Sequence, residues 1–123
     1  MPLAPPVGER LPRRATLRKS ADYQSCYRAG RRRHGPLLTL HIQPNPVGAP
    51  RLGITASRRV GNAVVRTRLK RWTRECYRRS PHRPGLPALD LVVHLKPEAG
   101  RASFASYTAE LDARLAELAG RRP

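Results

Sequence analysis

The segment from Arg58 to Arg79 constrains the fold more tightly than any other part of this 123-residue chain. Its apolar residues follow a four-three-four spacing: Val65, Leu69, Trp72 and Cys76. At 100° per residue these positions fall in one narrow stripe, which is typical of a helix with one face against a core. Asn62 is a favourable N-cap residue, so the pattern predicts a helix from Ala63 to about Arg78.

The rest of this predicted helix surface is cationic. Two rows of basic residues are expected, with Arg66, Lys70 and Arg74 in one and Arg68, Arg71 and Arg78 in the other. Glu75 is the only acid among them. Because like charges four residues apart destabilise a helix by a few tenths of a kcal/mol each, this surface is expected to lie against an anionic partner. A merely solvated helix face explains the pattern poorly, since cations stand on every side.

The charge of the whole chain points to the same kind of partner. Lys and Arg number 25 against 8 Asp and Glu, which gives a formal net charge of +17 at pH 7. Such an excess destabilises a compact domain by self-repulsion unless a polyanion binds it. Nucleic acid is the leading candidate because each neutralised phosphate releases condensed counterions, and an anionic membrane surface is the rival.

Hydrophobic periodicity predicts two more helices and three strands. A short helix is expected over Ala21 to Ala29, with Ser20 as its N-cap and Gly30 at its end. Strands are expected at residues 37–42 and 52–56, paired as a hairpin, and at residues 89–95. A last helix is expected between Ser103 and Gly120, with an inward face made of Phe104, Tyr107, Leu111, Leu115 and Leu118.

The order helix-strand-strand-helix-strand-helix predicts the α+β class, as a single-domain α/β sandwich. Residues 1–16 are rich in proline and arginine and are expected to form a disordered basic arm, followed by one RNA-binding domain over residues 17–120. No apolar run is long enough to span a membrane, and no secretory signal pattern is present. A cytoplasmic protein without a membrane partner is therefore expected.

The chain lacks the residue spacings of a catalytic or metal site. Its histidines are scattered, at His34, His41, His82 and His94, and there is no Gly-rich phosphate loop or carboxylate pair. Asp90, at the start of a strand, is interpreted as a capping or Arg-pairing residue. Any chemistry is therefore expected to come from a partner.

Five side chains near apolar patterns have structural interpretations. Cys26 and Cys76 are interpreted as buried, reduced thiols, and His94 as a core histidine. Tyr23 and Tyr27 lie beside a basic cluster, a combination that holds single-stranded nucleic acid by stacking. Ordinary core packing is an equally good explanation of both tyrosines.

Residues 51–75 resemble the signature of the bacterial ribonuclease P protein subunit, in which GI-x-x-S-[KR]-[KR]-x-GNAV-x-RNR-x-KR precedes an Arg-Glu pair. The matching residues are Gly53, Ile54, Ser57, Arg58, Arg59, Gly61, Asn62, Ala63, Val64, Arg66, Arg68, Lys70, Arg71, Arg74 and Glu75. Similar stretches at 17–23, 34–36 and 90–97 extend the resemblance over roughly residues 17–118. Thr67 departs from the pattern, because the middle residue of the RNR triplet is Asn in the family.

This resemblance implies a function and a set of site residues. The family's catalyst is a large RNA that uses Mg²⁺, held by the RNA, to remove the 5′ leader of precursor tRNA. Its protein has no catalytic residues and binds both that RNA and the leader. Contacts with the catalytic RNA are implied for Arg58, Arg59, Asn62, Arg66, Thr67, Arg68, Lys70, Arg71 and Arg74. Contacts with the leader are implied for Tyr23, Tyr27, Arg51 and Lys96.

The resemblance also implies a fold. It is a mostly antiparallel sheet flanked by helices, like domain 2 of ribosomal protein S5, with a left-handed crossover through the basic helix. Chain sterics alone favour a right-handed crossover. Two other functions, a ribosomal or structural RNA-binding protein and a DNA-binding helix-turn-helix protein, remain alternatives.

Overall fold

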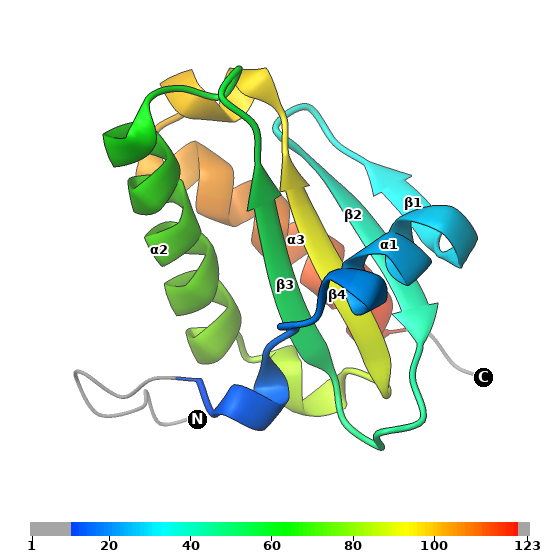
Figure 1. Cartoon of the computed structure of the whole chain (residues 1–123). Coiled ribbons are helices and arrows are strands. Elements are labelled where there is room, and N and C mark those ends of the chain that lie inside the picture. The colour runs from blue at the N-terminus through cyan, green and yellow to red at the C-terminus, as the bar shows by residue number, and fades with distance from the viewer. Residues whose placement is uncertain (1–10, 121–123) are drawn as a thin grey trace.

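Three helices flank one four-stranded sheet in the computed structural model, which describes residues 11–120 (Figure 1). In chain order the main elements are α1 (Ser20–Ala29), β1 (Arg31–His34), β2 (Leu38–Pro44), β3 (Arg51–Ala56), α2 (Ala63–Arg79), β4 (Leu89–Leu95) and α3 (Phe104–Ala119). Single turns of 3-10 helix lie at Arg13–Ala15, Arg83–Gly85 and Pro97–Arg101. The predicted α+β class and all six expected helices and strands are confirmed.

The sheet order is β1-β2-β4-β3, so the predicted hairpin between the second and third strands is wrong. β4 lies between them, antiparallel to β2 and parallel to β3. Its central residues 91–93 are all buried, and a strand that is apolar on both faces is most stable in the interior of a sheet. The β2–β3 loop therefore connects two strands that never pair.

The crossover from β3 through α2 to β4 is left-handed, as the family resemblance implied. Figure 1 views the sheet from the α1 side, with β4 to the right of β3 and α3 behind the sheet. Because α2 packs in the same core as α3, the chain leaves β3, passes behind the sheet and returns to its right.

β1 was not predicted, because its sequence is Arg-Arg-Arg-His. It pairs antiparallel with β2 at the edge of the sheet, with Arg32 opposite His41 and His34 opposite Thr39. Charged side chains are common on edge strands, where they oppose pairing with other chains. The basic run Arg31 to Arg33, which follows the first helix, is therefore part of a strand.

The two faces of the sheet differ in polarity. The face toward α2 and α3 carries the main core, in which alternate strand residues such as Leu40 and Val93 meet Leu69 and Leu111 from the helices. The face toward α1 carries a small cluster of Leu17, Cys26 and Val92, and otherwise has polar strand residues. A polar sheet face that is only partly covered by one helix is left available for a ligand.

The buried face of α2 is broader than the predicted stripe. Its fully buried residues include Leu69, Thr73 and Tyr77, whereas Val65, Trp72 and Cys76 pack at the margin. Thr73 was not counted as apolar, but its hydroxyl donates to the Leu69 carbonyl at 2.7 Å and meets the Tyr107 hydroxyl at 2.6 Å. Satisfied polar atoms allow Thr73 to be buried without a large penalty.

Three side chains differ from their predicted positions. Phe104 was expected to face inward, yet it is 53% exposed at the start of α3. Arg78, expected in an exposed cationic row, is 7% exposed and binds Glu75 with an N–O distance of 2.7 Å. Ser20 is the first residue of α1, whose N-cap is Lys19 without a side-chain bond.

Other local predictions are confirmed, except that Cys76, predicted to be buried like Cys26, is only partly buried. The Asn62 side chain accepts a hydrogen bond from the Val65 backbone at 3.0 Å and caps α2. Ser103 caps α3 in the same way, and Gly30 follows α1. Both cysteines are free thiols, and burial raises the pKa of each to about 11.

The predicted arm divides into two parts. Residues 1–10 lie outside the described residues. Residues 11–16 are folded onto the domain, since Leu11 packs against the main core and Thr16 bridges to Leu52 of β3. Within residues 11–120, no helix combines the length and the apolar character needed to cross a membrane.

Candidate nucleic-acid interface

The first candidate surface consists of α2 and the turn that precedes it. The residues implied to contact the catalytic RNA all lie there, on two adjoining structural elements. The exposed residues are Arg58, Arg59, Asn62, Thr67, Arg71 and Arg74, and the partly exposed ones are Arg66, Arg68 and Lys70. The structure therefore brings the whole implied set together on one side of the molecule.

Charge on α2 is distributed unevenly along its length. Glu75, the only acid of the helix, is held by Arg78 and by Arg79, whose Nε lies 3.4 Å from it. The bond from Arg78 holds the pKa of Glu75 below its usual value. Among residues 11–120, no ion pair forms at Arg66, Lys70, Arg71 or Arg74. The first three turns of α2 therefore present cations without internal compensation.

Two side chains of this surface already have intramolecular contacts. The Arg68 guanidinium lies over the Trp72 ring, 5.1 Å from its centroid, which fixes the arginine beside α3. The carbonyl oxygen of Asn62 is occupied as the α2 cap. Thr67, at the position where the family has Asn, is exposed and points away from the core.

The second candidate surface is the face of the sheet beside α1. The Tyr27 hydroxyl forms a 2.6 Å hydrogen bond with the Thr55 hydroxyl, which in turn lies 2.9 Å from Nδ1 of His94. The Tyr23 ring packs on Gly53, where any side chain would collide with it, and its hydroxyl donates to the Leu17 carbonyl at 3.3 Å. Burial raises the pKa of both tyrosines, so both hydroxyls remain protonated at neutral pH.

Both tyrosines are half-buried. Their positions therefore agree both with core packing and with a surface that could stack on nucleic acid, the two interpretations that the sequence left open. Each packs against the small cluster under α1 and keeps part of its ring accessible. The ring of Tyr27 also meets that of His41 edge-on, with centroids 4.6 Å apart. His94, interpreted as a core histidine, is likewise only partly buried at this surface.

Three histidines that are scattered in the sequence meet on this face. His34, His41 and His94 come from β1, β2 and β4, and the strand register places them on the same side. His41 is 7% exposed, and its Nδ1 has no partner among the residues described. Burial, with Arg32, His94 and His34 nearby, lowers the pKa of His41. Sequence analysis missed this group because its spacing of 7 and 53 residues has meaning only once the strands are paired.

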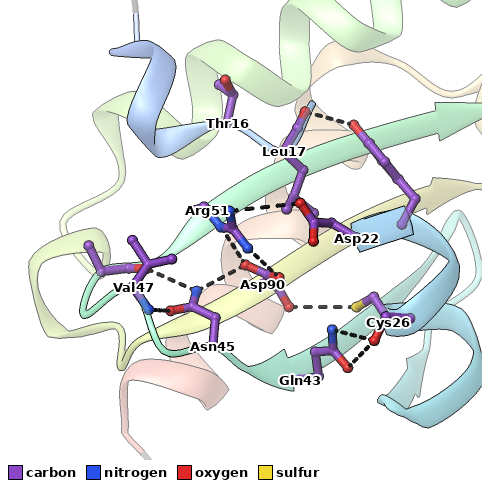
Figure 2. Close-up of polar contacts among 12 residues, drawn as sticks. Thr16, Leu17, Asp22, Cys26, Gln43, Asn45, Val47, Arg51 and Asp90 are labelled. Atoms are coloured by element: carbon purple, nitrogen blue, oxygen red, sulfur yellow. Dashed lines mark hydrogen bonds and ion pairs between the residues drawn. The ribbon is translucent and has the colours of Figure 1, made fainter. Parts of the chain in front are cut away.

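Arg51 is largely engaged within the protein (Figure 2). Its Nε and Nη2 donate to the two Asp90 carboxylate oxygens at 2.8 and 2.9 Å, and Asn45 donates to the same carboxylate at 2.9 Å. Asp22 of α1 lies 3.9 Å away on the other side. The predicted Arg-pairing role of Asp90 is confirmed, and the carboxylate raises the pKa of Arg51.

Lys96, the other implied leader contact, follows β4 directly. It is partly exposed, and its backbone nitrogen donates to the Leu37 carbonyl at 2.9 Å. By strand alternation it lies on the same face as His94, at the end of the sheet away from Arg51. The four implied leader residues thus lie on one face, but they do not form a single cluster.

The carboxylates of these two surfaces do not suit Mg²⁺, which binds through carboxylate oxygens. Asp90 is occupied by Arg51 and Asn45, and Glu75 by Arg78 and Arg79. Across residues 11–120, no group of three His, Cys, Asp or Glu side chains could hold a metal ion. The uncompensated cations of this arrangement suit the binding of a polyanion.

Comparison with known proteins gives a consistent result. Residues 11–119 match the family described as Ribonuclease P. The chain is 39% identical over 118 residues to the ribonuclease P protein component of Desulfovibrio desulfuricans, covering 92% of this chain and 89% of that protein. It is 38% identical over 120 residues to the corresponding protein of Streptomyces griseus, covering 89% and 96%.

Solved structures show the same fold. A mutant RNase P protein from Staphylococcus aureus, described as defective in mRNA degradation activity, matches with a TM-score of 0.78 at 26% identity, covering 85% of this chain and 90% of that one. The RNase P protein from Thermotoga maritima matches with a TM-score of 0.74 at 26% identity, covering 83% and 96%.

Proposed function

The chain belongs to the ribonuclease P protein family, whose work is tRNA processing, and we propose that it binds the catalytic RNA through α2 and the precursor tRNA leader through the α1 face of the sheet. The observation that carries the proposal is the uncompensated charge on the first three turns of α2. Cations without internal partners are free to displace counterions from an RNA backbone.

The polar face beside α1 supports the proposed leader site. Hydroxyl and imidazole groups of Thr55, His41 and His94 stand next to the accessible edge of Tyr27. Single-stranded RNA is recognised by stacking of splayed bases and by hydrogen bonds to their edges. A surface with aromatic edges, donors and acceptors fits a short unpaired leader.

We also propose that catalysis and Mg²⁺ belong to the RNA partner. The carboxylates nearest the two surfaces are bound to arginines, so this chain adds positive charge and positioning contacts. Positive charge beside an RNA active site offsets repulsion between phosphates and lowers the magnesium concentration that the assembled enzyme needs.

Reconstitution tests the proposal. Added to a bacterial ribonuclease P RNA at low Mg²⁺, the chain should restore removal of the leader from precursor tRNA. Absence of stimulation, with the chain bound to the RNA, would favour a structural RNA-binding protein. Duplex DNA that competes better than structured RNA would favour a DNA-binding protein.

Arginine variants test the catalytic-RNA surface. Arg66→Ala and Arg71→Ala should each weaken binding and reduce the slope of log affinity against log salt by about 1. Arg114→Ala, which removes a positive charge from α3, is the matched control and should leave both unchanged. Equal effects at all three positions would mean that net charge alone, and not the α2 surface, determines binding.

Tyr27→Ala tests the leader site. It should weaken binding of precursor tRNA to the assembled enzyme by about tenfold, as expected for loss of one base stack, and leave binding of leaderless tRNA unchanged. Tyr27→Phe retains the ring and removes the bond to Thr55, so it separates stacking from hydrogen bonding. An equal loss with leaderless tRNA would make Tyr27 a purely structural residue.

A further inference from the structure

An aromatic pair, the exposed Phe104 and the partly buried Trp72, joins α3 to α2 beside Arg68 and Arg71 of the first candidate surface. Phe104 is 53% exposed, and its ring meets that of Trp72 edge-on, with centroids 5.3 Å apart and planes at 85°. Trp72 also neighbours the Tyr107 ring, with centroids 6.4 Å apart, and the Arg68 guanidinium, 5.1 Å from the Trp72 ring centroid. An exposed phenylalanine beside a cation-capped tryptophan is unusual on the surface of so charged a domain, where large apolar side chains are mostly buried.

A groove of about 740 Å³ runs between the two helices beside this pair. The small and sulfur-containing side chains of Cys76, Ala105 and Ala109 form an apolar wall among the residues that line it. Burial raises the pKa of the Cys76 thiol to about 11, so this wall is uncharged at neutral pH. A concave apolar space within the range of about 300–1,000 Å³ is typical of sites for small planar ligands.

Charge around the groove favours an anionic occupant at its aromatic end. Arg71 is exposed on the rim beside Trp72, and Arg68 stands on the other side of that ring. The groove also contains Glu75 and Asp112, but Glu75 is held by two arginines. Asp112 accepts a 3.0 Å hydrogen bond from Ser80 and lies 3.7 Å from Nε2 of His82.

We propose that this groove binds an unpaired nucleobase of RNA, stacked on Phe104, with the adjoining phosphates at Arg68 and Arg71. The inference deepens the proposed function, since the base would belong to the catalytic RNA that lies along α2. Stacking on an aromatic face accepts any base, while the neighbouring arginines supply the affinity for the backbone. A second copy of the chain is a poorer occupant, because each copy carries a net charge of +17.

Trp72 is the only tryptophan of the chain, so tryptophan fluorescence reports on the surroundings of this one side chain, at the groove and beside Arg68. A single-stranded RNA of about ten adenosines should quench that fluorescence, because a base placed in the groove stacks close to the indole. The same strand paired with its complement should quench it far less, since its bases are no longer available. Equal quenching by the duplex would overturn the proposal and indicate phosphate contact only.

Variants at Phe104 test the stacking contact with the full-length chain and a bacterial ribonuclease P RNA. Phe104→Ala and Phe104→Leu should weaken binding by about tenfold, whereas Phe104→Tyr should keep the affinity. Val47→Ala removes another exposed apolar side chain, 52% exposed in the β2–β3 loop, and should have no effect. Thermal unfolding of each variant shows whether the fold is intact.

The outcomes separate this inference from the proposed function. If Phe104→Ala leaves RNA affinity and Trp72 quenching unchanged, and leader removal is still stimulated, the nucleobase proposal for the groove is overturned and the proposed function stands. Normal quenching by single-stranded RNA without any stimulation of the catalytic RNA would overturn the proposed function alone. Trp72 fluorescence that depends on protein concentration without RNA would overturn the nucleobase proposal in favour of self-association.

Discussion

At the scale of single residues, Asp90 shows how a buried charge can organise a surface. Asp90 is 2% exposed, and its carboxylate is satisfied by Arg51 from β3 and Asn45 from the β2–β3 loop. Arg51 also reaches toward Asp22, so one ion-pair group ties α1 to the sheet. The position of α1, and hence of the tyrosines on it, depends on this group.

Removal of the Arg51 side chain should therefore lower the stability of the fold. We expect Arg51→Met to lower the free energy of unfolding by about 3 kcal/mol, because it leaves a buried carboxylate with only one side-chain partner. The double variant Arg51→Met with Asp90→Asn should recover at least half of that loss, as measured by urea denaturation. A single variant that unfolds like the parent would show that the ion pair contributes little.

His41 should make stability depend on pH. The pKa of His41 is lowered in the folded state. The contribution of neutral His41 to stability is therefore complete above 6.5, its pKa in the unfolded state, and is lost as pH falls through its pKa in the folded state. The free energy of unfolding should fall between pH 7 and 5, at no more than about 1.4 kcal/mol per pH unit for this one group. His41→Gln should make the free energy of unfolding depend less steeply on pH. An unchanged slope would assign the pH dependence to other groups.

Thr67 is the one departure from the family's RNR triplet. Its side chain is exposed on α2, and Thr and Asn have similar helix propensities. Thr67→Asn should leave the melting temperature unchanged and, by restoring an amide, tighten binding to the catalytic RNA. Weaker binding in a titration with that RNA would show that the hydroxyl has its own contact.

At the scale of elements, local signals predicted the helices and the apolar strands well. Caps at Asn62 and Ser103 fixed the starts of α2 and α3 because capping involves neighbouring residues only. The strand at residues 31–34 was missed because its stability comes from pairing with β2, and its own sequence has no strand pattern. The prediction that Phe104 faces inward was wrong because Phe104, the first residue of α3, lies on the side of the helix that faces away from the core.

The α2 cap allows helix stability and RNA binding to be separated. Asn62→Ala should lower the free energy of unfolding by about 1 kcal/mol, because the backbone nitrogen of Val65 loses its partner. Asn62→Asp keeps the cap and should retain stability, yet it places a negative charge at the proposed RNA surface and should weaken binding. Both effects can be measured by thermal unfolding and by RNA titration, and full RNA affinity in the Asp variant would place Asn62 outside the interface.

At the scale of the whole molecule, self-repulsion is the main electrostatic feature. Ion pairs among residues 11–120 are few, whereas the whole chain carries a net charge of +17. Raising KCl from about 0.05 M to about 0.5 M shortens the screening length severalfold and should raise the melting temperature. A melting temperature that falls with KCl would mean that ion pairs such as Arg78–Glu75 outweigh repulsion.

The sequence by itself determined the polarity of α2, the helix and strand types and the family, because periodicity, capping and an ordered motif are properties of neighbouring residues. Only the tertiary structure decided which strands pair, and with them the meeting of Thr55 with His94 across 39 residues and of Arg51 with Asp90. It also decided that Phe104 and Trp72 share one groove. Contacts between distant residues depend on strand order and helix packing, and spacing along the chain carries no information about either.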